Sequence, residues 1–188
     1  MGRLTVEQIV TVDGYAADPG GGLDFFLADG EVDANDADQL TFLEGVDAIL
    51  LGANTYRLFA DYWPTADPTV ERVAEPINRL PKFVVSNTLD TAPWGDGAIE
   101  VLRGDGVEST RALKERFAHI VVWGSLTLAD ALFEAGLVDG LRLRLVPVLI
   151  GAGRSFTPAP LERRERRLAL DHTVAHPSGH VTLAYEVR

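Results

Sequence analysis

Short apolar runs that stop on small residues recur along the first two thirds of the chain. Most of these runs are followed by a segment whose apolar residues recur three or four positions apart, the spacing of an amphipathic helix. An unbroken apolar run of this length is typical of a strand buried on both faces of a parallel sheet. The clearest runs are residues 47–52, 81–88 and 119–125, and they predict three central strands.

Helical spacing then predicts the elements that connect these strands. The predicted helices are residues 33–46, 54–63, 68–80, 109–117 and 126–135. Asn54 is the expected N-cap of its helix, and Thr127 with Asp130 fits a capping box in the last one. Gly136 is expected to end that last helix, while Pro76 disfavours helix in the second half of 68–80.

Further strand patterns lie outside the three central runs, and the chain ends in strands alone. Residues 3–12 alternate loosely, residues 98–104 form another short run, and residues 139–151 alternate leucine with arginine. Two final runs flank residues 177–179, Pro-Ser-Gly, which is a hairpin signal. We therefore expect an α/β fold in one domain, residues 1–188: a mixed, mostly parallel sheet with helices on both faces and an antiparallel C-terminal hairpin.

Charge and composition narrow the function classes. The formal net charge of -11 disfavours binding to nucleic acid or to an anionic membrane surface, because both depend on lysine and arginine. The chain has no cysteine, which excludes disulfides, thiolate zinc sites and a cysteine nucleophile. No signal peptide and no apolar run of membrane-spanning length is present, so the expectation is a cytoplasmic protein.

Three histidines near the C-terminus raise the question of a metal site. His172, His176 and His180 are spaced four apart, which on a helix would place them on one face. Pro177 and Gly179 are incompatible with that helix, so we interpret the histidines as strand and turn residues and expect no metal.

The candidate chemistry lies where the buried runs end. In open α/β sheets, ligands bind outside the carboxyl ends of the strands, and the free N–H groups of a following helix favour an anion. Two turns fit such a phosphate cradle: Gly52, Ala53, Asn54 and Thr55, and Gly124, Ser125, Leu126 and Thr127. Such turns also carry glycine and serine for conformation alone, so a purely structural role stays open. Neither a G-x-G-x-x-G nor a P-loop motif is present.

The order of four motifs resembles that of the dihydrofolate reductase-like superfamily. The motifs are TVDGYAA (11–17), ILLGANTYRLFADYW (49–63), KFVVSNT (82–88) and IVVWGSLTLADALFEAGLVDGLRLRLVPVLIGAG (120–153). Within it, the chain is most similar to the reductase domain of the bifunctional deaminase-reductase of riboflavin synthesis and to its stand-alone relatives. The resemblance implies an NADPH-dependent reductase, usually a homodimer, acting on a small heteroaromatic substrate.

The resemblance also implies roles for single residues toward the cofactor. Gly52 and Thr55 would bind its phosphates, Ser86 and Asn87 would lie near the adenosine ribose and its 2′-phosphate, and residues 124–127 would hold the pyrophosphate. The family commonly has a basic residue where this chain has Ala53, and a second glycine where it has Ser125. Arg103 could replace the missing base in part, and NADH is not excluded as the cofactor.

On the substrate side, the resemblance places Asp13 and Gly14 in the cleft and Asp24 where a carboxyl serves proton transfer. Asp13 and Asp24 are accordingly the catalytic candidates. Tyr56 and Arg154 are further candidates for contact with the substrate. Three of these candidates have a structural alternative: a turn for Asp13, a helix cap for Asp24 and core packing for Tyr56.

Two classes of function remain open from the sequence. The first is the reductase, and the second is a non-catalytic nucleotide-binding module that retained the fold. A serine hydrolase is disfavoured because the chain has no G-x-S-x-G motif.

Overall fold

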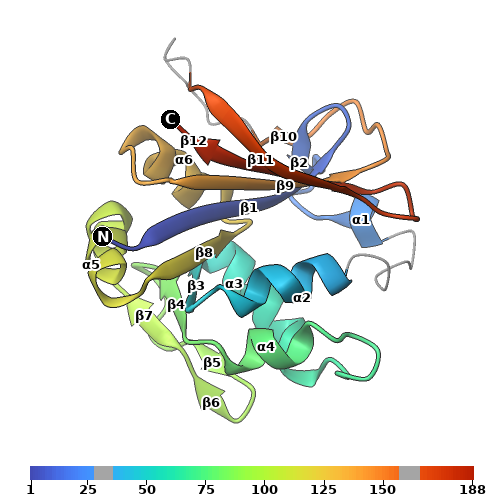
Figure 1. Ribbon diagram of the computed structural model, residues 1–188. Helices are drawn as coiled ribbons and strands as arrows, with labels where there is room; N and C mark the ends of the chain where they lie inside the picture. The colour runs from blue at the N-terminus through green and yellow to red at the C-terminus, as the bar shows by residue number, and fades with distance from the viewer. Residues whose placement is uncertain (28–35, 157–165) are drawn as a thin grey trace.

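An eight-stranded sheet forms the centre of the protein in a computed structural model that describes residues 1–27, 36–156 and 166–188 (Figure 1). The strand order is β11-β12-β9-β1-β8-β3-β4-β7. Their bounds are β1 (Arg3–Thr11), β3 (Ala48–Gly52), β4 (Lys82–Val85), β7 (Glu100–Leu102), β8 (His119–Trp123), β9 (Gly140–Val146), β11 (Leu168–Ala175) and β12 (Val181–Val187).

Strand direction confirms the predicted mixed sheet. Every neighbouring pair from β9 to β7 is parallel, while β12 is antiparallel to both β9 and β11. The three central runs expected from the sequence are the parallel neighbours β8, β3 and β4. Two small antiparallel pairs lie outside the sheet: β2 (Tyr15–Ala17) with β10 (Arg154–Ser155), and β5 (Pro93–Trp94) with β6 (Gly97–Ala98).

Helices cover both faces of this sheet. They are α1 (Asp24–Leu27), α2 (Asp36–Glu44), α3 (Ala53–Tyr62), α4 (Ala74–Arg79), α5 (Gly106–Arg116) and α6 (Leu126–Glu134), with a 3-10 turn, η2 (Trp63–Thr65), after α3. Leu113 of α5 and Leu132 of α6 pack into one core, whereas Tyr56 of α3 and Ile77 of α4 pack into the other. The two helix pairs therefore lie on opposite sides of the strands.

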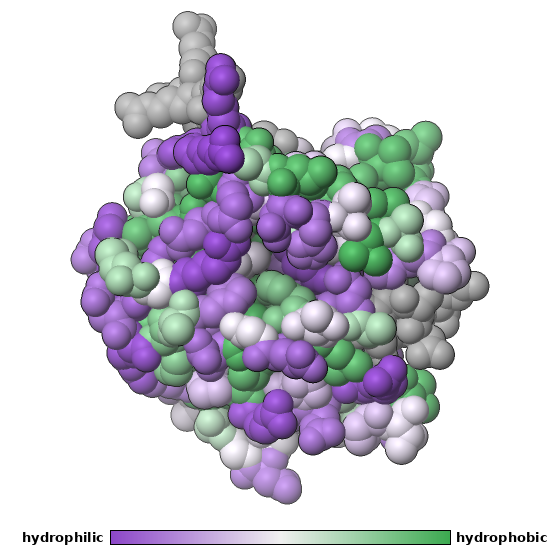
Figure 2. Space-filling view, in the orientation of Figure 1, coloured by the Kyte–Doolittle hydropathy of each residue, from purple (hydrophilic) through white to green (hydrophobic). Residues whose placement is uncertain are grey.

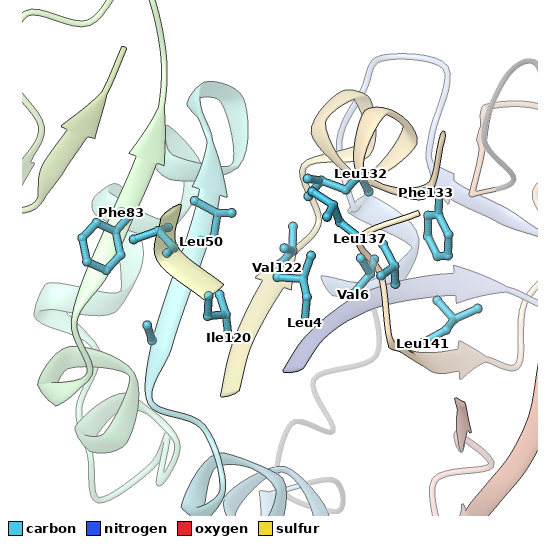
Figure 3. Packing of buried hydrophobic residues seen from close by; sticks show 14 residues of the cluster. Leu4, Val6, Leu50, Phe83, Ile120, Val122, Leu132, Phe133, Leu137 and Leu141 are labelled. Carbon is cyan, nitrogen blue, oxygen red and sulfur yellow. The ribbon is translucent and has the colours of Figure 1, made fainter. Parts of the chain in front are cut away.

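Strand β3 shows how the sequence supplies two cores at once. Ala48 and Leu50 point into the first core, and Ile49 and Leu51 point into the second. Each of these four side chains is fully buried. Figure 3 shows Leu50 within the first core, together with leucines and Phe133 from the α6 region. Successive residues of a strand face opposite sides of the sheet, so a strand buried on both sides has apolar residues at every position. The unbroken apolar run in the sequence therefore predicted this strand.

The helix starts differ from the predictions at two positions. Gly52 occupies the N-cap of α3, and the exposed Asn54 instead accepts a hydrogen bond from Arg57 (3.0 Å). Ser125 occupies the N-cap of α6, so the expected capping box of Thr127 and Asp130 is wrong. In both cases the preceding turn, held by tertiary contacts, decides where the helix begins.

Other boundaries follow from local chemistry. Helix α5 begins three residues before the predicted start because the carboxylate of Asp105 accepts the N–H groups of Val107 and Glu108. The predicted helix 68–80 is reduced to α4, with Pro76 in its first turn, where a missing N–H costs little. Gly136 ends α6 as predicted: its φ of 67° is left-handed, and its N–H donates to Phe133.

Candidate functional site

The ends of β3 and β8 form a switch point in the sheet. The two strands are neighbours, yet the chain leaves β3 toward β4 and leaves β8 toward β9, on the far side of β1 (Figure 1). Helices α3 and α6 consequently start side by side and run onto opposite faces. In open α/β sheets this arrangement leaves a crevice at the carboxyl ends of the strands, where ligands bind.

Hydrogen bonds join the two turns that start these helices. The N–H of Gly52 donates to the hydroxyl of Ser125 (2.7 Å), and the N–H of Ser125 donates to the hydroxyl of Thr55 (2.8 Å). The Ser125 hydroxyl itself donates to the carbonyl of Trp123 (2.8 Å). The structure therefore brings together the two turns that the sequence proposed separately, and it makes them a single unit.

Gly124 is required at this joint for two reasons. Its φ of 52° lies in the left-handed region, which costs glycine least. A Cβ at this position would lie 3.0 Å from the Thr55 hydroxyl oxygen, closer than side chains normally pack. The sequence predicted a phosphate cradle at this turn. The group that approaches is Thr55 from the neighbouring turn.

Several N–H groups of the predicted cradle already have partners within the protein. Gly124 donates to the carbonyl of Glu7, and Gly124 also accepts a hydrogen bond from the side chain of Gln8. The donors left for an anion are the first-turn N–H groups of α6 and α3, which have no acceptor within their helices. These groups belong to residues 126–128 and 53–55. The Thr55 hydroxyl, which accepts from Ser125, can donate its own proton as well.

The turn after β4 holds the residues assigned to the adenosine side. The Ser86 hydroxyl accepts the N–H groups of Thr88 and Leu89, which stabilises the turn. Asn87 bonds both to the N–H (2.6 Å) and to the carbonyl (3.3 Å) of Gly104. Arg103 reaches the same turn by donating to the carbonyl of Leu89 (2.8 Å). A half-exposed guanidinium therefore lies beside this turn.

Asp13 forms a clamp between the end of β1 and the loop that follows β9. Its carboxylate accepts the hydroxyl of Thr11 (2.6 Å) and the N–H groups of Gly151 (2.8 Å) and Ile150 (3.2 Å). The Thr11 bond, above all, lowers the pKa of Asp13 below its ordinary value. An ionised Asp13 can accept the hydrogen bonds of this clamp, but it has no proton to donate to a substrate. The adjoining Gly14 has a φ of 85°, as a tight turn requires.

The remaining substrate candidates are not brought together. Asp24 is exposed at the first residue of the short helix α1. Tyr56 is 5% exposed, and its hydroxyl donates to the carbonyl of Pro93 (2.8 Å), so its ring packs in the core. Arg154 forms an ion pair with Asp130 of α6. This pairing places its charge against the second turn of that helix.

Sequence reasoning missed a buried polar network next to the switch point. Glu7 on β1 accepts hydrogen bonds from the Trp123 indole (3.0 Å), from Gln39 (3.0 Å) and from Arg142. Arg142 also bonds to Asp38 of α2. The signal in the sequence was a glutamate in the middle of the predicted strand 3–12. Leucine alternates with arginine along β9, a pattern typical of a strand with one solvent-facing side, yet Arg142 is 2% exposed.

Two further observations concern metal ions and membranes. In the described ranges, no cluster of three or more His, Asp or Glu side chains is arranged to hold a metal ion. No helix within the same ranges has the length and apolar character needed to cross a membrane. In Figure 2, hydrophilic residues cover much of the visible face, and hydrophobic residues form several separate groups.

One curated relative matches nearly the whole chain. The uncharacterized protein YyaP of Bacillus subtilis (strain 168) is 27% identical over 97% of this chain and 94% of its own length.

Two solved structures show the same fold over the whole chain. One is a diaminohydroxyphosphoribosylaminopyrimidine deaminase/5-amino-6-(5-phosphoribosylamino)uracil reductase from Thermotoga maritima, with a TM-score of 0.70, 15% identity and 57% of that chain covered. The other is dihydrofolate reductase from Enterococcus faecalis complexed with NADP(H), with a TM-score of 0.59, 16% identity and 97% covered.

The family match covers almost the whole sequence. The family of the RibD C-terminal domain matches residues 3–182. This match supports a reductase-type function and a fold like that of dihydrofolate reductase. The chain belongs to the RibD C-terminal domain family.

Proposed function

We propose that this protein is an NADPH-dependent reductase that transfers hydride to a small heteroaromatic substrate of the pterin or aminopyrimidine kind. The observation that carries the proposal is the pair of helix N-termini joined at the switch point, in a chain of this family. One structural neighbour is a reductase of a phosphoribosylaminouracil, and another is a dihydrofolate reductase that binds NADP(H).

The donors at the switch point suit the diphosphate of a dinucleotide. Leu126 and Thr127 contribute first-turn N–H groups of α6, and α3 contributes those of residues 53–55. The Thr55 hydroxyl adds a donor between them. Neutral donors of this kind can hold an anion in a protein of net charge -11, because the helix dipoles supply the local positive potential.

The turn after β4 suits the adenosine end. Ser86 and Asn87 would border the ribose, and Arg103 would face a 2′-phosphate. Arg103 lies beside this turn, whereas Ala53 supplies no charge at the first one. An arginine near the 2′-position favours NADPH over NADH, since NADH has no phosphate there.

Reduction also needs a proton at the substrate. The bound nicotinamide supplies the hydride, and the protein orients the two reactants. We assign proton delivery to Asp24, which is exposed and free of the clamp that engages Asp13. Asp13 and Gly14 would shape the cleft by holding the loop after β9 against the end of β1.

A homodimer is the proposed assembly. Strand β11 is an edge strand of the sheet, and its Leu168 and Leu170 are 41% and 57% exposed. An edge strand with exposed leucines offers a surface for a second copy to cover. Light scattering at micromolar concentration tests this assembly, and a monomer would contradict it.

The experiment for the function uses the purified protein. Titration with NADPH and with NADH, followed by tryptophan fluorescence, should show tighter binding of NADPH. Trp123 is a suitable reporter because it directly precedes Gly124. NADPH oxidation is then measured with pterin and aminopyrimidine substrates. If neither dinucleotide binds at millimolar concentration, the proposal is wrong; binding without turnover of any substrate favours the non-catalytic module.

A further inference from the structure

Ser125 has a backbone conformation that is unusual for its residue type. Its φ and ψ are 54° and 43°, and of the described residues other than glycine it is the one with positive φ. A left-handed conformation is unfavourable for a residue with a Cβ atom, and it persists only where surrounding contacts compensate. Contacts of the side chain and N–H of Ser125 must therefore hold this turn.

The Ser125 hydroxyl continues the sheet where β8 ends. Strands β3 and β8 pair as far as Leu50 and Val122, after which β8 turns away. Gly52 lies two residues beyond Leu50 in β3, so its N–H points toward β8 as that of Leu50 does. Because β8 has turned away at that point, no strand carbonyl is there to accept this N–H. The hydroxyl of Ser125 accepts this N–H at 2.7 Å and thus replaces a strand carbonyl.

The same residue bonds to both turns of the candidate cofactor site. Its hydroxyl links Gly52, at the start of α3, to the carbonyl of Trp123 at the end of β8. Its N–H links the start of α6 to the hydroxyl of Thr55. The two turns also touch here, because a Cβ on Gly52 would be in van der Waals contact with the Ser125 hydroxyl oxygen at 3.4 Å. Ser125 is thus a direct connection between two helix N-termini on opposite faces of the sheet.

We propose that Ser125 is a positioning residue that sets the distance between the N-termini of α3 and α6. Its hydroxyl and N–H are used inside the protein and do not bind the ligand. This inference rests on the proposed function, because the spacing matters for a ligand that contacts both helices. The diphosphate of a dinucleotide is such a ligand, and a nucleoside monophosphate bound only near Ser86 is not.

The test compares two variants with the wild type. Ser125→Gly removes the hydroxyl and relieves the backbone conformation, whereas Ser125→Ala removes the hydroxyl and keeps the unfavourable Cβ. We expect both variants to bind NADPH about tenfold more weakly, which corresponds to ~1.4 kcal/mol. Binding of adenosine 2′-monophosphate should change less than about twofold in either variant, an effect below ~0.5 kcal/mol. Calorimetric titration measures both ligands.

Thermal unfolding separates positioning from simple stabilisation. Ser125→Gly should melt closer to the wild type than Ser125→Ala, because glycine tolerates the positive φ. The control is Thr41→Ala, which removes a hydroxyl bond to Ala37 inside α2 and joins no two elements. It should leave the affinities for both ligands unchanged.

The outcomes distinguish the two proposals. A wild-type protein that binds no dinucleotide overturns the proposed function, and the positioning role with it. A wild type that binds NADPH, with equal NADPH affinity in Ser125→Gly, overturns the positioning role alone. An equal loss of affinity for NADPH and for adenosine 2′-monophosphate would also overturn it, because that result indicates a general disturbance of the fold.

Discussion

The two faces of strand β1 are both buried but are built from opposite chemistry. Leu4 and Val6 point into the core that α5 and α6 cover, and both are fully inaccessible. Thr5 and Glu7 point to the other face and are each 4% exposed. Burial alone therefore does not distinguish the faces. The first is stabilised by apolar contact, and the second depends on hydrogen bonds and ion pairs among its polar groups.

The polar face is arranged around Arg142 of β9. Its guanidinium bonds to Glu7 and Asp38, and it also lies over the ring of Phe42 at 4.6 Å from the ring centre. A single buried cation between two carboxylates connects β1, β9 and helix α2. Such a group adds little stability over an apolar core of the same shape, but removal of one partner leaves a charge buried without compensation. The polar face should therefore tolerate single substitutions less well than the apolar face.

Loss of the central cation should have the largest effect. Arg142→Ala leaves Glu7 and Asp38 without their cation, and we expect the free energy of unfolding to fall by about 3–5 kcal/mol. The control is Arg3→Ala on the same sheet, because the bidentate Arg3–Glu186 pair is much more exposed, at 38% and 44% of the two side chains. Its cost should be about 0–1 kcal/mol. Urea unfolding measures both variants, and equal losses would contradict the distinction between buried and exposed pairs.

The apolar face should respond to a cavity. Leu132→Ala removes a fully buried side chain from the first core, with an expected loss of about 2–5 kcal/mol. Leu170→Ala, at a 57% exposed position on β11, should change the unfolding free energy by less than about 0.5 kcal/mol. A loss at Leu132 larger than that of Arg142→Ala would show that the apolar face is the more sensitive one.

The turn after β8 is the place where helices on the two faces of the sheet begin side by side, and Gly124 tests it. Gly124→Asp places a Cβ 3.0 Å from the Thr55 hydroxyl oxygen and a negative charge beside the anion donors. We expect NADPH affinity to fall by at least about tenfold, ~1.4 kcal/mol, together with some loss of stability. Gly136→Asp is the control: its φ is also positive, but no atom lies within 4 Å of the added Cβ. It should cost about 1 kcal/mol of stability and leave NADPH affinity unchanged. Unchanged NADPH affinity in a folded Gly124→Asp protein would make this turn purely structural.

The smallest effect concerns a histidine at the rim of the polar face. His119 lies between the hydroxyl of Thr5 and the carbonyl of Gly45, each at 2.9 Å. Burial lowers its pKa below 6.5, although the Gly45 carbonyl acts in the opposite direction. The unfolded chain then binds the proton more readily than the folded one, so stability is lost as the pH falls through 6.5.

Replacement of this imidazole should flatten that pH dependence. His119→Gln can still donate to Gly45 and accept from Thr5, but it does not titrate. The loss of stability on acidification below about pH 6.5 should become shallower, as measured by urea midpoints across a pH series. His172→Gln, at a half-exposed position on β11, is the matched control. An unchanged slope in His119→Gln would assign the acid sensitivity to other groups.

Much of the architecture could be predicted from local pattern. The unbroken runs of β3 and β8 predicted buried parallel strands because only a strand covered on both faces needs apolar residues at every position. The glycine and serine residues at their ends predicted turns that lead into helices, and Gly136 predicted the end of α6. These features depend on residues close together in the chain, so the sequence contains the whole signal.

The contacts between distant polar groups were decided only by the tertiary structure, through the order of the strands in the sheet. The insertion of β8 between β1 and β3 places Ser125 against Gly52, and no local pattern contains that contact. The same order buries Arg142, although its alternation with leucine is typical of a strand with one exposed side. Hydrophobic periodicity tells which side of an element is covered, but pairing of polar groups depends on which elements become neighbours. The sequence by itself therefore determined the elements and their buried sides, and the sheet order decided which polar groups meet at the candidate site.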